Sequence, residues 1–255
     1  MSLFDRFRLD GDVAVVTGGN RGIGRAIAAG LAEAGADVVI ANRDAESGQE
    51  AAAEIAEETD AETLAVRTDV TNEDHVREMV ETTVDEFGDV DILVNNAGVT
   101  YHNSVADKPV SEFQKTLDIN LTGAYRCSKY AGEVMQQTDG GVIINVSSMS
   151  AFIANYPQHQ VDYQASKAGL EGFKNQLASE WAEYDIRVNN INPGYVFTDN
   201  IVHGEETIET WRSEMLVEEF ASPEDIAPLA VYLASDAAWY VTGESVVIDG
   251  GYTVR

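Results

Sequence analysis

The sequence predicts a doubly wound α/β fold, in which a parallel sheet of seven strands carries helices on both faces. Short apolar runs alternate with longer helical segments along the 255 residues, and a glycine-rich turn follows the first run. Runs of this length and composition are typical of buried parallel strands. Strands that alternate with helices form a parallel sheet covered on both sides. Because no Pro/Gly/Ser-rich linker interrupts the chain, we expect one domain spanning residues 1–255.

Each element follows from its local pattern. The expected strands are residues 13–16, 38–40, 63–67 (the weakest run), 92–94, 142–146, 186–191 and 246–248. The expected helices are residues 23–34, 45–57, 73–87, 112–136, 163–183 and 223–234. Residues 205–220 break the alternation with Trp211, Met215 and Phe220 among acids. This segment is interpreted either as a substrate lid, within an insertion at 197–220, or as an ordinary surface helix.

The charge balance limits the possible partners. The chain has 44 acidic and 16 basic residues and a formal net charge of −28, which argues against nucleic acid and anionic lipid as partners. We hypothesise a halophilic source with a high-salt cytoplasm, because counterions would screen the self-repulsion. No apolar run approaches a membrane span, and the first residues lack a secretory signal, so we expect a cytoplasmic protein. Cys127, the only cysteine, receives no catalytic role.

Residues 17–24, Thr-Gly-Gly-Asn-Arg-Gly-Ile-Gly, lie between the first strand and the first helix. Glycine permits a tight turn, and a helix N-terminus offers free N–H groups to phosphate. The spacing is not G-x-G-x-x-G, so the position between strand and helix is the stronger argument. A Rossmann-type dinucleotide site is predicted, with the ligands Gly18, Asn20, Arg21, Gly22, Ile23 and Gly24.

The end of the second strand bears on the choice of cofactor. An NAD site usually has an acid there, whereas this chain has Asn42 followed by Arg43. Asn42 would not repel a 2′-phosphate, and Arg43, aided by Arg21, could pair with it. The sequence therefore favours NADP over NAD. Asp44 lies next to these residues, and either arginine could instead be a solvated surface charge.

Tyr163 and Lys167 lie four residues apart in Tyr-Gln-Ala-Ser-Lys, so a helix places them on one face. A phenol has a pKa of about 10, and a neighbouring ammonium favours its phenolate form. The pair can therefore supply a usable acid and base. A Tyr-x-x-x-Lys pair also arises by chance on surface helices, so the pair gains weight only together with other motifs.

Three further motifs follow later strands: Asn95-Asn96-Ala97-Gly98, Ser147-Ser148 and Pro193-Gly194. With the glycine turn and the Tyr–Lys pair, in this order, the chain resembles the short-chain dehydrogenase/reductase family over nearly its whole length. The resemblance implies hydride transfer between a nicotinamide dinucleotide and a carbonyl or alcohol carbon. It implies that Tyr163 exchanges the proton, Lys167 binds the nicotinamide ribose and lowers the phenol pKa, Ser148 hydrogen-bonds the substrate oxygen, and Asn120 shapes a helix kink and holds a relay water.

The choice of serine stays open, because this chain has two more residues between serine and tyrosine than many relatives. We expect Ser148 rather than Ser147, and Ser150 is a less favoured substitute. Further cofactor contacts are implied by the resemblance: Asp69 and Val70 at the adenine, Asn96, Ala97 and Gly98 at the adenosine ribose, and Pro193, Gly194, Val196 and Thr198 near the nicotinamide. It also suggests a homotetramer that packs through residues 120–136 and 163–183.

The substrate is expected to be a small carbonyl or alcohol compound. Residues 155–160 resemble the corresponding loop of the family's polyol and ketose reductases, such as sorbose reductase, mannitol dehydrogenase and xylulose reductase, although an ordinary exposed loop can have this composition. A 3-oxoacyl-thioester reductase is the alternative enzyme, with Phe152, Ile153 and residues 211–220 along an acyl chain. A dinucleotide-sensing regulator is the non-enzymatic alternative. The four histidines are scattered, so no metal site is predicted.

Overall fold

The computed structural model describes residues 2–198 and 205–254, and these residues contain one seven-stranded sheet with the strand order β3-β2-β1-β4-β5-β6-β7. All neighbouring strands run parallel. The predicted sheet is confirmed, including its weakest strand. The strands are β1 (Val13–Thr17), β2 (Asp37–Asn42), β3 (Thr63–Arg67), β4 (Ile92–Asn95), β5 (Gly141–Val146), β6 (Ile186–Pro193) and β7 (Ser245–Ile248).

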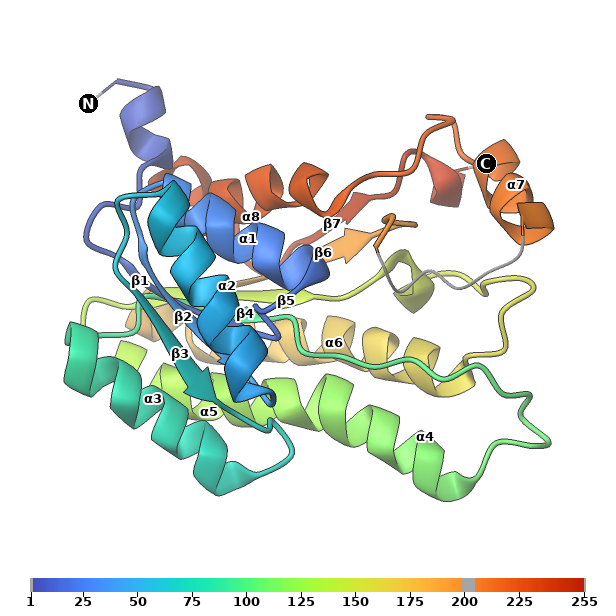
Figure 1. Ribbon diagram of the computed structural model, residues 1–255, viewed down its shortest axis with the longest axis horizontal. Coiled ribbons are helices and arrows are strands. Elements are labelled where there is room, and N and C mark those ends of the chain that lie inside the picture. The colour runs from blue at the N-terminus through green and yellow to red at the C-terminus, as the bar shows by residue number, and fades with distance from the viewer. Residues whose placement is uncertain (1, 199–204, 255) are drawn as a thin grey trace.

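Helices cover both faces of the sheet, as predicted (Figure 1). One face carries α1 (Gly22–Glu33), α2 (Ala45–Glu58) and α8 (Ala227–Ala234). The other face carries α3 (Glu73–Phe87), α4 (Val110–Leu117), α5 (Gly123–Met135) and α6 (Val161–Glu180). The order of the strands reverses between β1 and β4, and open sheets of this kind bind ligands at the carboxyl ends of the strands near that point.

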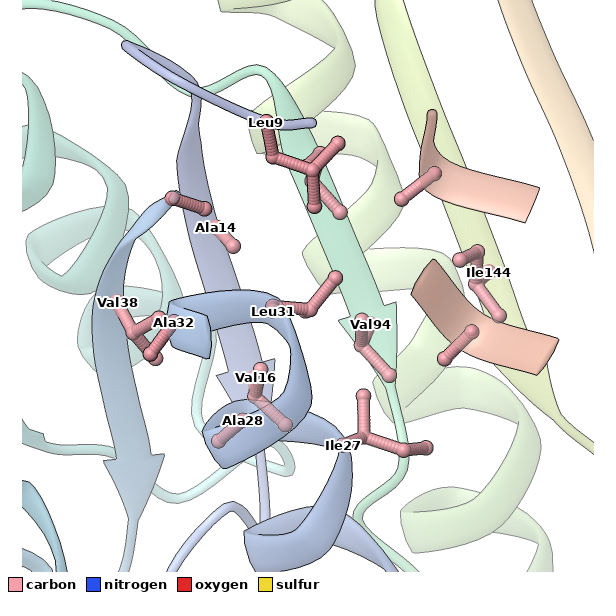
Figure 2. Close-up of a cluster of buried hydrophobic side chains, with 14 of the residues drawn as sticks. Leu9, Ala14, Val16, Ile27, Ala28, Leu31, Ala32, Val38, Val94 and Ile144 are labelled. Carbon is pink, nitrogen blue, oxygen red and sulfur yellow. The ribbon is translucent and has the colours of Figure 1, made fainter. Parts of the chain in front are cut away.

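A hydrophobic core lies on each side of the sheet. Under α1, the side chains of Ile27 and Leu31 pack against Val16 of β1 and Val94 of β4, and all four are fully buried (Figure 2). The opposite core contains Met79 of α3 and Met135 of α5, together with β-branched residues of the central strands. Burial on both faces explains why these strands are continuous apolar runs in the sequence.

The predicted helix over residues 112–136 is wrong as one element. The structure divides it into α4, a π-helical turn at Asp118–Thr122, and α5. Neither glycine nor proline lies within the turn, so the apolar pattern did not show the break, but the resemblance had implied a helix kink at Asn120, which lies in this turn. Single π-helical turns inside α-helices frequently occur at functional sites.

The last part of the chain also differs in detail from the expectation. Residues 223–225 form a short 3₁₀ turn before α8 begins at Ala227. Within residues 205–220, α7 (Glu205–Glu214) lies beyond the carboxyl ends of the strands, near the C-terminus (Figure 1). Residues 199–204 of the expected insertion, which include His203, lie outside the described residues. No helix in the described ranges has the length and apolar character needed to cross a membrane.

Candidate active site

The glycine turn combines positive φ angles with close packing. Gly18 and Gly22 have φ angles of 65° and 54°, a region that favours glycine. A Cβ on Gly24 would lie only 2.3 Å from both the Gly18 carbonyl oxygen and Asn96 Nδ2. Asn96 Nδ2 in turn donates to the carbonyl oxygens of Thr17 and Gly18, at 3.0 and 3.1 Å. The turn is therefore held against the end of β4.

The first turn of α1 is open to an anion. Its N-cap, Arg21, makes no side-chain capping bond, whereas Asp44 caps α2 by accepting from the backbone N–H groups of Glu46 and Ser47. Unsatisfied N–H groups at a helix N-terminus, together with the helix dipole, favour phosphate. The turn thus has the donor set that a dinucleotide pyrophosphate requires.

A cavity of about 660 Å³ adjoins this turn. It brings together fourteen of the residues predicted to bind the cofactor: Gly18, Asn20, Arg21, Gly22, Ile23, Gly24, Asn42, Arg43, Asp69, Val70, Asn96, Ala97, Gly98 and Thr198. Ser47 and Thr68 also line it and were not predicted. Ser47 could not be recognised from the sequence because it lies on the first turn of α2, outside any motif.

The far end of this cavity has a polar and cationic rim. Asn42 is buried, and its Nδ2 donates to the Asp44 carbonyl oxygen at 2.5 Å and to Ser47 Oγ at 3.3 Å. Within the described ranges, Arg21 and Arg43 form no ion pair, whereas Arg25 pairs with Glu54 at 2.7 Å. Two unpaired guanidinium groups at the end of a dinucleotide cavity fit a phosphate group there.

A second cavity of about 260 Å³ contains the predicted chemistry. Tyr163, Lys167 and Ser148 line it, with Pro193 and Gly194 from the end of β6. It shares the lining residues Ile23, Asn96, Gly98 and Val99 with the first cavity. An elongated dinucleotide can therefore extend from the glycine turn to Tyr163.

The phenol of Tyr163 interacts with both other members of the constellation. Burial raises its pKa, and a hydrogen bond with Ser148 opposes this shift. Lys167 Nζ lies 5.5 Å from the centre of the tyrosine ring and donates to the Val146 carbonyl oxygen at 2.6 Å. Burial lowers the pKa of Lys167 to about 8, and Glu171 opposes that shift.

The shift that we expected for the pKa of the Tyr163 phenol therefore has the wrong direction. We expected Lys167 to lower it, whereas burial of the phenol dominates and raises it. The same desolvation weakens the charge of Lys167 itself. Ser148 is the group that favours the phenolate.

The three serines at the end of β5 have different surroundings. Ser148 contacts the phenol and donates to Ser150 Oγ at 3.1 Å. Ser147 Oγ instead donates to Glu171 Oε1 at 2.8 Å. Ser150 is buried and its backbone N–H donates to Ser148 Oγ. This geometry supports Ser148, rather than Ser147 or Ser150, as the serine that acts together with Tyr163.

Asn120 lies in the π-helical turn and is buried. Its Oδ1 accepts from the backbone N–H of Val99 at 2.8 Å, and its Nδ2 donates to the Val99 carbonyl oxygen at 2.9 Å. Nδ2 also donates to Ser166 Oγ at 3.1 Å. The side chain thus fixes the segment after β4, which lines the second cavity, against α6.

Two sets of residues predicted to contact cofactor or substrate lie only partly at the cavities: Val196 with Thr198, and the loop at 155–160. Val196 is buried, forms a bridge with Ala221 and lines neither cavity, while Thr198 lines the first. In the loop at 155–160, Asn155 and Gln160 are buried and hydrogen-bonded to each other at 3.2 Å. Their amides therefore stabilise the loop, and Tyr156 and His159 are its exposed polar members. Among the described residues, no group of three or more His, Cys, Asp and Glu side chains is placed to hold a metal.

Comparison with known proteins identifies the family. Residues 18–253 match a family model described as enoyl-(acyl carrier protein) reductase. An NADP-dependent mannitol dehydrogenase of Hypocrea jecorina is 37% identical over 99% of this chain and 96% of its own. A 3-oxoacyl-[acyl-carrier-protein] reductase of Synechocystis is 36% identical over 95% of this chain and 97% of its own. The crystal structure of a short-chain type dehydrogenase/reductase from Mycobacterium marinum, 38% identical, superposes with a TM-score of 0.93 and covers both chains completely.

The chain belongs to the short-chain dehydrogenase/reductase family. As a member of this family it is a dinucleotide-dependent oxidoreductase that acts on a small molecule. The resemblance inferred from the motifs at the strand ends is confirmed, and so is the fold.

Proposed function

We propose that this short-chain dehydrogenase/reductase interconverts a secondary alcohol and a ketone of the sugar or polyol class with NADP as cofactor. One observation carries the chemistry: the Tyr163 phenol, hydrogen-bonded to Ser148, lines a cavity continuous with the glycine turn. Among the described residues, Tyr163 and Lys167 are the only ionisable side chains that line the second cavity and could exchange a proton there.

Each site residue has a separate role in the reduction of a carbonyl group. When held by the residues that line the first cavity, NADPH would supply a hydride to the carbonyl carbon. Tyr163 donates its proton to the carbonyl oxygen, so ketone, hydride and proton give the alcohol. Ser148 donates a hydrogen bond to the developing negative charge on that oxygen. Asn120 positions the segment after β4, and Lys167 provides positive charge beside the phenol.

The preference for NADP rests on the rim of the first cavity. Asn42 offers no negative charge there, and the Asp44 carboxylate accepts from the first turn of α2. Arg21 and Arg43 line the same cavity. The mannitol dehydrogenase among the relatives is NADP-dependent by name, which supports the assignment.

The polar composition of the loop at 155–160, with Tyr156 and His159 exposed, supports a hydroxyl-rich substrate. Tyr195 Oη donates to Gln158 Oε1 at 3.1 Å and accepts from Asn155 Nδ2 at 3.3 Å, which ties the loop at 155–160 to the segment after β6. Tyr195 also stacks on Trp211 of α7, with ring centres 4.2 Å apart. We infer that residues 205–220, the described part of the expected insertion, form the outer wall of the substrate site as a lid.

The test is a panel of ketoses, polyols, aldonates and 3-oxoacyl thioesters, assayed with both cofactors in high salt. We expect turnover of ketoses or polyols and a loss of at least 1000-fold in kcat for Tyr163→Phe. Normal turnover by Tyr163→Phe on the best substrate would remove Tyr163 from the mechanism. The matched control is Tyr184→Phe, at an exposed phenol remote from the cavities.

One observation favours a second function, reduction of 3-oxoacyl thioesters. Phe152, Leu216 and Val217 expose large apolar surfaces, with exposed fractions of 52%, 60% and 58%. An acyl chain could lie along such surfaces. Activity on acetoacetyl thioesters without activity on ketoses would select this function instead.

Assembly, location and source complete the proposal. We propose a homotetramer formed through α5 and α6, in a halophilic cytoplasm. Exposed Tyr125 and Val161 on these helices support the interface, and the net charge of −28 supports the environment. Sedimentation at high salt tests the tetramer, and a monomer would refute it.

A further inference from the structure

Glu171 is a half-buried acid directly behind the candidate site. It lies on α6 one helical turn beyond Lys167, which itself lies one turn beyond Tyr163. Its Oε1 accepts from Asn192 Nδ2 at 2.7 Å and from Ser147 Oγ at 2.8 Å. Its Oε2 accepts from Ser245 Oγ. Both carboxylate oxygens therefore accept hydrogen bonds, from donors at the ends of β5 and β6 and at the start of β7.

These donors are chain neighbours of the site residues. Ser147 precedes Ser148, and Asn192 precedes Pro193. Asn192 Nδ2 also donates to the Ser148 carbonyl oxygen at 3.1 Å. A single carboxylate thus joins the ends of β5 and β6, which carry one wall of the second cavity, to the helix that carries Tyr163 and Lys167. Movement of Glu171 would displace both walls together.

Glu171 is also a source of negative charge for Lys167. Burial alone would raise the pKa of Glu171, but the hydrogen bonds from Ser245, Asn192 and Ser147 outweigh it, so the carboxylate stays ionised. For Lys167, burial lowers the pKa to about 8, and Glu171 is the group that opposes this shift. The ammonium of Lys167 therefore depends on the acid one turn away.

We propose that Glu171 is a positioning residue of this oxidoreductase, which ties the strand ends bearing Ser148 and Pro193 to α6 and keeps Lys167 charged during turnover. This inference rests on the proposed function. Glu171 does not reach the reacting atoms and acts through Lys167 and Ser147.

The other ionisable groups near this pair cannot replace Glu171. Lys167 faces the Tyr163 ring on α6 and the Val146 carbonyl oxygen of β5. Glu171 has Lys174 as its ionic neighbour, with Nζ 4.0 Å from Oε2. Lys174 donates to Ser245 Oγ at 2.6 Å. The negative charge of Glu244, which directly precedes β7, opposes the lowering of the Lys174 pKa by burial. Glu244 acts on Lys174, which leaves Glu171 as the acid that acts on Lys167.

The test compares Glu171→Gln with wild type through the pH profile of kcat/KM for carbonyl reduction. Glutamine keeps the shape and most hydrogen bonds but removes the charge. Because an ammonium is lost as pH rises through its pKa, wild-type activity should fall on the alkaline side near pH 8. This alkaline limb should move to lower pH in Glu171→Gln, because the carboxylate that favours the ammonium is lost. Tyr163, whose pKa is raised, would titrate later.

Two controls separate charge from structure. Glu180→Gln makes the same change at an exposed position of α6 and should leave the limb in place. Glu171→Asp retains the charge, so its limb should stay at the wild-type position while kcat falls from the altered contacts.

Three results would each overturn the proposal: an unshifted limb in folded Glu171→Gln, a shift in Glu171→Asp as large as that of charge removal, or failure of both variants to fold. The last result would show that Glu171 is required for folding. A wild type without dehydrogenase activity would instead refute the proposed function.

Discussion

The ion pair between Asp162 and Lys108 offers a quantitative test of how the site is supported. Asp162 directly precedes Tyr163, and its side chain is fully buried. Its Oδ1 lies 2.9 Å from Lys108 Nζ, and its Oδ2 accepts from Thr116 Oγ1 at 2.6 Å. Lys108 Nζ also donates to the Tyr101 carbonyl oxygen at 3.0 Å. The pair thus joins the segment after β4 to the N-terminus of α6.

Asp162→Asn removes the charge and leaves one donor without an acceptor. Loss of one partner from a buried pair costs about 3–5 kcal/mol. Lys108 keeps Glu112 as a second partner at 3.0 Å, with its own side chain only 2% exposed, so we place the loss at the lower end, about 3 kcal/mol. For a chain of this size, that loss lowers Tm by about 6–12 °C.

Urea unfolding and thermal melting at pH 7 measure this loss, and kinetics should show kcat/KM reduced by about tenfold because the segment after β4 loses its anchor. The control Asp10→Asn changes the exposed pair with Arg8 and should leave Tm unchanged. A Tm for Asp162→Asn equal to wild type would refute the reasoning, since the pair would then contribute nothing to the fold.

The same pair predicts a pH dependence of stability. Burial alone would raise the pKa of Asp162, but the hydrogen bonds from Thr116 and Lys108 outweigh it, and the pKa lies below its ordinary value. A depressed carboxyl pKa contributes stability above its unfolded value of about 4, and this contribution is lost as pH falls through the folded value. The stability difference between wild type and Asp162→Asn should therefore be constant from pH 5 to 9 and shrink below about pH 4. A difference that persists unchanged at pH 2 would contradict the assignment.

Three further predictions concern the cofactor, the sheet and the charge. Arg43→Ala should lower the ratio of kcat/KM for NADPH to that for NADH by about 10- to 100-fold, because a charge-assisted hydrogen bond is lost, whereas Arg77→Ala should not change it. Asn145→Ala should cost about 2–3 kcal/mol in urea unfolding, because fully buried Asn145 accepts from Asn95 at 3.0 Å and donates to Asn190 at 2.9 Å; the exposed control Asn175→Ala should be neutral. Tm should rise from dilute buffer to molar KCl as counterions screen the net charge of −28, and equal stability throughout would count against a halophilic source.

The sequence predicted the sheet well because burial on both faces makes each strand a continuous apolar run. Even β3, the weakest run, has the expected bounds, Thr63–Arg67. The helix kink that the resemblance implied at Asn120 is present as the π-helical turn at Asp118–Thr122, but the apolar pattern alone could not predict it, because it depends on the bonds from Asn120 to Val99, which are remote in the chain. Fourteen cofactor positions lie together because parallel strands end at one edge of the sheet.

Polar residues were harder to assign, since their role depends on their partners. Asn155 and Gln160 suggested contacts to sugar hydroxyls, yet both are buried and bonded within the protein. Ser147 and Ser148 are neighbours in the chain but face different partners, Glu171 and Tyr163. Residue type and spacing do not distinguish these environments.

Of the 44 acidic residues of the chain, Asp162 and Glu171 have specific roles beside the candidate site because they are held away from solvent by hydrogen-bond and ion-pair partners. Asp162 and Glu171 lie on α6 on either side of the Tyr163–Lys167 pair, and each bonds to a different wall of the second cavity. Asp162 joins α6 to the segment after β4, whereas Glu171 joins it to the ends of β5 and β6. Only Glu171 acts on the charge of Lys167. Loss of Asp162 should therefore reduce stability without moving the alkaline limb of activity, and loss of the Glu171 charge should move that limb. If both variants moved it equally, the helix would respond to general loosening and neither acid would have a separate role.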